Sequence, residues 1–185
     1  MVDDEVWVYL DSNVLVDLGE ALDGSWVPPD PLDESTDIRR VAAARIVLFA
    51  GRRGWVVATS TEARKEGLRG LAFQLLDPLI IEVDELNGGP TDSVVQDLVA
   101  RYTDVGLKLA DATHAAQCAS RPQFRLFVTS DTGILNKAPA VETLHRIEFV
   151  TPSKALERMN LQPGEEPAIR PSESNPARQP AWWIP

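Results

Sequence analysis

The chain has few residues of several types, and each shortage excludes a class of protein. Its 185 residues include one cysteine and two histidines. A lone cysteine, Cys118, cannot build an internal disulfide framework or a cysteine-based zinc site, and we expect it to be a small core residue. No apolar run approaches the length that crosses a bilayer, and the N-terminal "MVDDEVW" carries acids where a signal peptide carries bases. We therefore expect a cytoplasmic protein without membrane contact.

Residues 1–37 contain no lysine or arginine, although they hold eleven acids. The net charge of −10 is therefore concentrated at one end, and the rest of the chain is nearly neutral. This local acidity does not exclude a nucleic-acid partner. The acidic segment 17–37 is either solvated, or it opposes the approach of RNA or binds a basic partner. Five bases form either a solvated face or a surface for RNA phosphates: Arg52, Arg53, Arg64, Lys65 and Arg69.

Short apolar runs alternate with segments of helical spacing along most of the chain. The runs predict strands at 6–10, 55–59, 79–83, 124–131 and 147–151. The spacing predicts helices at 13–20, 36–54, 60–77, 91–106, 107–120, 132–137 and 152–159. This alternation predicts an α/β fold, a three-layer α/β/α sandwich around a parallel sheet of about five strands. We expect one domain over 1–159, with an acidic loop at 20–36, and a proline-rich tail over 160–185 that carries Trp182 and Trp183.

Four acids lie where a parallel sheet would bring them together. Asp11 directly follows the first strand, and Asp131 follows the fourth. Glu62 begins the helix after the second strand, and Asp111 lies on a predicted helix. Ligands of open α/β sheets bind at the carboxyl ends of the strands, where the strand order reverses. If the first and fourth strands are neighbours, these carboxylates converge on one crevice.

Taken singly, each acid has a simpler explanation. Asp11 and Asp131 could cap helices. Glu62 could be a first-turn acid that the helix dipole favours, and Asp111 could pair with a neighbour on its own helix. Taken together, four carboxylates in one crevice would repel one another unless a cation relieved the repulsion. Oxygen ligands suit Mg²⁺ or Mn²⁺. A metal held in this way can promote hydrolysis of a phosphodiester bond.

Four stretches resemble the motifs of the PIN domain family. They are "YLDSNVLVDL", "ATSTEARKE", "GLKLADATHAA" and "FVTSDTGIL", spread over residues 5–150. The resemblance implies a Mg²⁺- or Mn²⁺-dependent ribonuclease with RNA as substrate. Many small members are VapC-type toxins, so it also implies a cognate antitoxin protein and a homodimer.

The resemblance assigns roles to particular residues of this chain. Asp11, Glu62, Asp111 and Asp131 would form the catalytic, metal-binding pocket. Asn13 and Thr129 would orient the metal ligands or water, and Glu66 is a weaker candidate for the pocket. The long acidic loop and the tail are additions to the compact toxin pattern.

Two other interpretations stay open. A haloacid dehalogenase-type phosphatase also begins with a strand that ends in aspartate, but it needs a second aspartate where this chain has Asn13. A PIN-fold protein could instead serve RNA processing outside a toxin pair, or bind a partner without catalysis. The two histidines, His114 and His145, are expected to serve packing or the surface.

Overall fold

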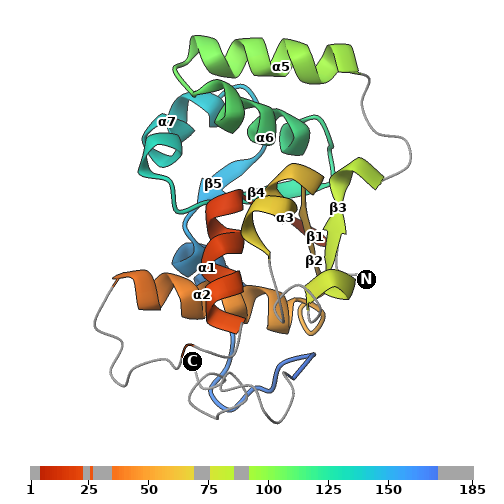
Figure 1. Ribbon diagram of the computed structural model, residues 1–185, viewed down its shortest axis with the longest axis vertical. Coiled ribbons are helices and arrows are strands. Elements are labelled where there is room, and N and C mark those ends of the chain that lie inside the picture. Colours follow the sequence, from red (N-terminus) through yellow and green to blue (C-terminus); the bar gives the residue numbers. More distant parts are fainter. Residues whose placement is uncertain (1–4, 23–25, 27–34, 69–75, 86–91, 171–185) are drawn as a thin grey trace.

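A five-stranded, all-parallel sheet lies at the centre of the molecule (Figure 1). The structure is a computed structural model, and it describes residues 5–22, 26, 35–68, 76–85 and 92–170. The strands are β1 (Val6–Leu10), β2 (Trp55–Thr59), β3 (Ile80–Glu82), β4 (Phe124–Val128) and β5 (Glu148–Val150). Their order is β3-β2-β1-β4-β5. The predicted parallel sheet is confirmed, and β1 and β4 are neighbours as expected.

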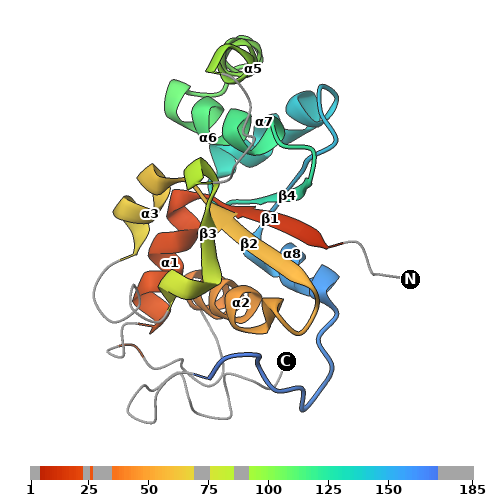
Figure 2. The same ribbon diagram turned by 90° about the vertical axis from the view of Figure 1, so that its right-hand side faces the viewer.

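Helices cover both faces of this sheet, as Figures 1 and 2 show. They are α1 (Ser12–Leu22), α2 (Ser35–Ala50), α3 (Thr61–Gly67), α5 (Asp92–Asp104), α6 (Leu109–Ala119), α7 (Thr132–Glu142) and α8 (Pro152–Met159), with 3-10 turns η1 (Asp77–Leu79) and η2 (Val83–Glu85) beside β3. α1, α2 and α8 share one core with the sheet, whereas α5, α6 and α7 share a second. The structure is therefore a three-layer α/β/α sandwich. In the described part of the chain, no helix combines the length and apolar character needed to span a bilayer.

The alternation of β1 explains why both faces need a cover. Val8 and Leu10 belong to the core shared with α1 and α2, while Tyr9 points to the opposite core. There the Tyr9 ring stacks on Phe127 of β4 at 5.1 Å between centroids. Strands buried on both faces read as continuous apolar runs, which is why "VWVYL" has no polar position. β1 therefore lies at the centre of the sheet, and packing on both of its faces fixes the position of its carboxyl end.

Several predicted boundaries differ from the structure. α1 continues through Gly19 to Leu22, so the predicted loop start at Glu20 is wrong. Gly19 is not a helix stop, because its missing side chain lets α3 approach closely: a Cβ there would meet the Gly67 carbonyl oxygen at 2.7 Å. α7 continues through Pro139 to Glu142, and β4 ends at Val128. The rest of the predicted loop, residues 23–25 and 27–34, lies outside the described residues.

The first part of the predicted tail lies against the domain. The backbone N–H groups of Ala168 and Ile169 donate to the Leu48 carbonyl of α2, at 2.9 and 3.4 Å. Leu161 and Ile169 pack against the same core as α2 and α8. Residues 160–170 thus cover one end of that core. Trp182 and Trp183 lie outside the described residues.

The close packing of α1 on α3 gives a direct test. A Cβ at Gly67 would lie 2.3 Å from the Leu15 Cβ, so Gly67→Ala should lower the free energy of unfolding by about 2 kcal/mol through overpacking. Urea unfolding measures this change. Gly51→Ala is the matched control, because its Cβ would meet the Ala168 Cβ at an ordinary 3.4 Å. Equal stability of the two variants would contradict the packing.

Candidate functional site

The chain order reverses between β1 and β4, and this is where the acids gather. β2 and β3 lie on one side of β1, whereas β4 and β5 lie on the other. The backbone ladder continues past the strand ends: the Asp11 N–H donates to the Val128 carbonyl at 3.0 Å, and the Thr129 N–H donates to Val150 at 3.0 Å. These bonds fix the two residues that follow the strands. Such a switch point is the usual binding crevice of an open α/β sheet.

Asp11 is buried, with 3% of its surface exposed, and three donors hold its carboxylate. Its Oδ1 accepts from the Ser12 N–H at 2.9 Å. Its Oδ2 accepts from Asn13 Nδ2 and from Thr129 Oγ1, both at 2.8 Å. A carboxylate held from two elements has little freedom to rotate. Its orientation is therefore set by the fold.

Thr129 joins this carboxylate to the loop that carries Asp131. Its hydroxyl donates to Asp11 and accepts from Asn13 Nδ2 at 3.2 Å and from the Asp131 N–H at 3.0 Å. One donor and two acceptor positions are all that a hydroxyl offers, so Thr129 is fully bonded. Asn13 Oδ1 also accepts from the Ser130 N–H at 2.9 Å. Asn13 and Thr129, both expected to orient ligands, thus contact Asp11 directly.

Asp131 and Asp111 complete a group of three aspartates. Asp131 caps α7, because its Oδ1 accepts from the Gly133 N–H at 2.6 Å and the Ile134 N–H at 3.3 Å. Burial raises the pKa of Asp111, and the charge of Asp131 raises it further. Burial likewise raises the pKa of Asp11, with Asp111 adding to it, although the Thr129 hydrogen bond opposes the rise. Asp111 is therefore within electrostatic range of both Asp11 and Asp131, and Thr129 links Asp131 to Asp11.

Glu62, the fourth expected acid, does not contact the three aspartates among the described interactions. Its side chain is exposed in the first turn of α3. α3 begins at the carboxyl end of β2, next to β1, so Glu62 shares the edge of the sheet with the aspartates. Glu66, one turn later, is also exposed. The structure thus brings together Asp11, Asp111 and Asp131, and places Glu62 at the same edge.

His114 is a neighbour of the acids that the sequence analysis did not assign to the site. Its Nδ1 lies 3.2 Å from the Tyr9 hydroxyl and 3.3 Å from Ser60 Oγ. Its charge acts on both Asp11 and Asp111 and opposes part of the rise that burial causes in the pKa of each. Asp111 and His114 are three positions apart on one helix, so the sequence could indicate that His114 lies near Asp111. The contacts to Tyr9 and Ser60 depend on three separate elements meeting.

The donor set fits a hard, hydrated divalent cation. The converging side chains are carboxylates, which Mg²⁺ and Mn²⁺ prefer. Among the described residues, no group of three or more His, Cys, Asp or Glu side chains is placed so that it could hold a metal ion together. Mg²⁺ does not need such a group, because it keeps several waters and binds through one or two carboxylates. Asp11 and Asp111 could hold such an ion, with Asp131 near it.

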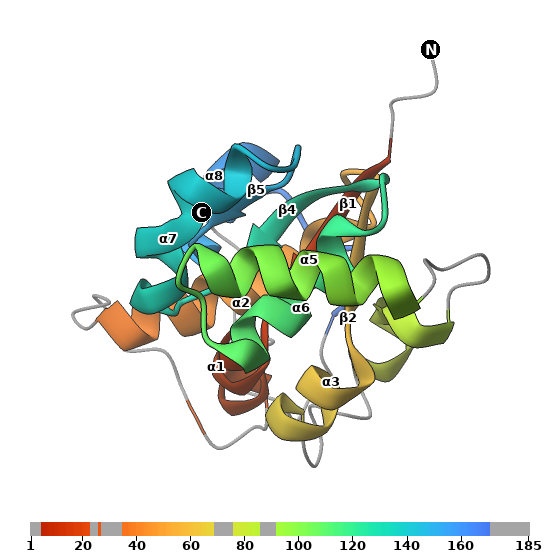
Figure 3. The same cartoon turned by 90° about the horizontal axis from the view of Figure 1, so that it is seen from above.

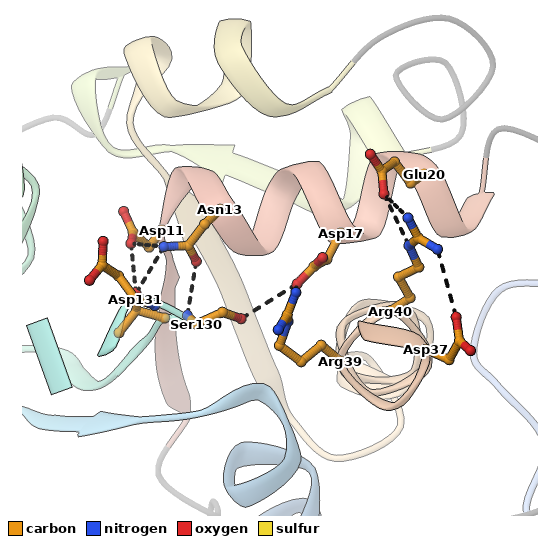
Figure 4. Close-up of polar contacts among 10 residues, drawn as sticks. Asp11, Asn13, Asp17, Glu20, Asp37, Arg39, Arg40, Ser130 and Asp131 are labelled. Carbon is orange, nitrogen blue, oxygen red and sulfur yellow. Dashed lines mark hydrogen bonds and ion pairs between the residues drawn. The ribbon is translucent and has the colours of Figure 1, made fainter. Parts of the chain in front are cut away.

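The acids of α1 and α2 pair with arginines of the same chain (Figure 4). Arg39 Nε donates to Asp17 Oδ2 at 3.1 Å. Arg40 pairs with Glu20 and, at 3.7 Å, with Asp37. Ser130 Oγ reaches the same Asp17 oxygen at 3.5 Å, which connects this network to the Asp131 loop. In the described part of segment 17–37, Asp17 and Glu20 thus hold α1 against α2, whereas Asp37 pairs within α2.

The five expected RNA-binding bases do not form one surface. Arg64 is buried and pairs with Asp77 and, at 3.2 Å, with Glu82, so it joins α3 to β3 instead of facing RNA. Arg52 and Arg53 lie in the turn before β2, at the amino edge of the sheet, opposite Asp11. Arg53 also pairs with Glu165 at 2.5 Å. Lys65 is exposed on α3, and Arg69 lies outside the described residues.

Comparison of the chain with protein-family models, with curated proteins and with solved structures found no match. The function of the site is therefore inferred from its residues, their geometry and the four sequence motifs.

The hydroxyl of Thr129 gives a test of the site's construction. Thr129→Val keeps the shape but removes one donor from Asp11 and the acceptor for Asn13 and Asp131. Because these buried groups lose a partner, the free energy of unfolding should fall by about 2 kcal/mol. Urea unfolding measures this, and Thr103→Val, on the exposed side of α5, is the control. An unchanged stability of Thr129→Val would contradict the network.

Proposed function

We propose that the protein is a metal-dependent endoribonuclease that uses Mg²⁺ or Mn²⁺ to hydrolyse phosphodiester bonds of RNA. The observation that carries this proposal is the placement of Asp11 and Asp131, linked through Thr129, at the switch point between β1 and β4, with Asp111 in electrostatic range of both. The resemblance of four motifs to the PIN family supplies the RNA substrate class. Both lines of support concern the same residues.

The side chains would divide the work as follows. Asp11 and Asp111 would hold the cation, and Asn13 and Thr129 keep the Asp11 carboxylate in one orientation. When bound, the cation would neutralise charge on the phosphodiester and lower the pKa of a bound water. One oxygen of Asp131 is fixed by a hydrogen bond from the first turn of α7, and the charge of Asp131 acts on Asp111. Asp111 and Asp131 are only half-buried, so this edge of the sheet is open to a substrate.

The alternative of an aspartyl phosphatase fits this geometry less well. Its nucleophilic carboxylate must reach a phosphorus atom, whereas Asp11 is buried and accepts three hydrogen bonds. Its acid/base position is occupied by Asn13, which donates to Asp11 and accepts from the Ser130 N–H. An amide cannot act as the general acid or base that this chemistry needs.

Removal of one pocket carboxylate tests the proposal. Asp11→Asn should lower Mn²⁺-dependent cleavage of labelled RNA at least a hundredfold, and Asn13→Ala about tenfold or more, since neighbours that orient a ligand typically matter that much. Glu62→Gln should lower it less, because Glu62 is exposed. Asp97→Asn, an exposed acid of α5, is the matched control. Absence of wild-type cleavage, or equal cleavage by Asp11→Asn, would contradict the proposal.

The role as toxin of a type II toxin–antitoxin pair, with an antitoxin partner and a homodimer, rests on the family resemblance. Induced expression in bacterial cells should arrest growth for the wild type and not for Asp11→Asn. A small open reading frame that overlaps the gene on its upstream side should restore growth when co-expressed. Cleavage without growth arrest would favour an RNA-processing role, and neither activity would favour a binding module.

A further inference from the structure

A second cleft opens at the opposite edge of the sheet from the aspartates. It encloses about 510 Å³ and lies where β4 begins and where the chain enters β5. Asp131 follows the other end of β4, a strand length of roughly 15 Å away. The cleft is therefore distinct from the acidic site. It is lined by Ala119, Arg121, Pro122, Phe124, Arg125, His145, Arg146 and Ile147.

The polar lining of this cleft is cationic. Arg121, Arg125 and Arg146 contribute guanidinium groups, and none of the described lining residues carries a carboxylate. Arg101 of α5 is near enough to act on His145: its charge, added to burial, lowers the pKa of His145. A cationic cleft is notable in a chain of net charge −10. Such a concave region concentrates anions.

Two buried nitrogens in this lining have no hydrogen-bond partner among the described residues. They are His145 Nε2 and Arg121 Nε. Buried polar atoms of proteins are rarely left without a partner. Both belong to side chains that line the same cleft. These lining side chains thus carry two polar atoms that no described residue satisfies, and both atoms lie beneath the surface of the cleft.

A bulge in β4 exposes one of the arginines. Trp7 pairs with Phe124, and Val8 pairs with Leu126, so Arg125 is an extra residue in the strand. A bulge re-aims a side chain, and Arg125 is exposed between two buried neighbours. Its guanidinium donates to the Pro122 carbonyl at 2.5 Å. Arg121 is likewise held, by the Val83 carbonyl at 2.5 Å.

We propose that this cleft binds a phosphate monoester of nucleotide size. A phosphate monoester carries a charge near −2 and three acceptor oxygens, which suits several guanidinium groups at once. The volume is in the range of small-molecule sites, and two of the arginines are already positioned by backbone carbonyls, which lowers the cost of ordering them. The cleft lies at the amino edge of the sheet, and its binding of a phosphate monoester does not depend on the nuclease proposal.

The two histidines of the chain make the test direct. The pKa of each histidine is measured by NMR from its ring signals, in buffer with a chelator and without divalent metal. The measurement is repeated with adenosine 5′-monophosphate, with inorganic phosphate and with adenosine. The monophosphate should raise the pKa of His145, because an anion favours its charged form, and should leave His114 unchanged. Inorganic phosphate should do the same more weakly, and adenosine should do nothing. Asp11→Asn should bind like the wild type.

Charge removal locates the ligand. The double variant Arg125→Gln, Arg146→Gln should weaken the Kd for adenosine 5′-monophosphate about tenfold or more, with folding checked by circular dichroism. Arg52→Gln, an exposed arginine at the same edge outside the lining, should leave the Kd unchanged. No shift at His145, or equal weakening by Arg52→Gln, would overturn the proposal. A short RNA with hydroxyls at both ends that bound His145 as tightly would overturn the assignment to a monoester.

Discussion

The Asp11 carboxylate, buried between β1 and β4, depends on donors from two segments more than a hundred residues apart. Asn13 belongs to α1 and Thr129 follows β4, and both bond the same oxygen of Asp11. These bonds form only if the two strands are neighbours in the observed register. Burial of a carboxylate is costly unless donors compensate for it. The sheet order, the first turn of α1 and the Asp131 loop therefore depend on one another through this group.

The molecule separates its charges between the two edges of the sheet. The carboxyl edge holds Asp11, Asp111 and Asp131, whereas the amino edge at β4 and β5 holds Arg121, Arg125 and Arg146. Figure 3 shows α5 and α6 crossing in front of the sheet. In parallel sheets the carboxyl edge is the usual place for ligands. The cationic cleft at the amino edge would be a second, separate site for an anion.

Much of the fold follows from local patterns, but the site's contacts do not. Five apolar runs sufficed to predict the parallel sheet, and α8 begins and ends where its pattern predicts. The first helix continues past its predicted end at residue 20 to Leu22, and the role of Gly19 within it depends on packing against α3. His114 meets Tyr9 and Ser60 only after three elements assemble. The exposure of Arg125 follows from strand register, which sequence alone does not reveal.

The central claim is that the junction of β1 and β4 holds a divalent cation between Asp11 and Asp111. Anomalous diffraction at the manganese absorption edge, from crystals grown with Mn²⁺, locates such an ion without relying on activity. The account predicts a peak within ligand distance, about 2.2 Å, of oxygens of both aspartates, and its loss in crystals of Asp111→Asn. Absence of a peak there in the wild type, or a peak that persists in the variant, would contradict the account.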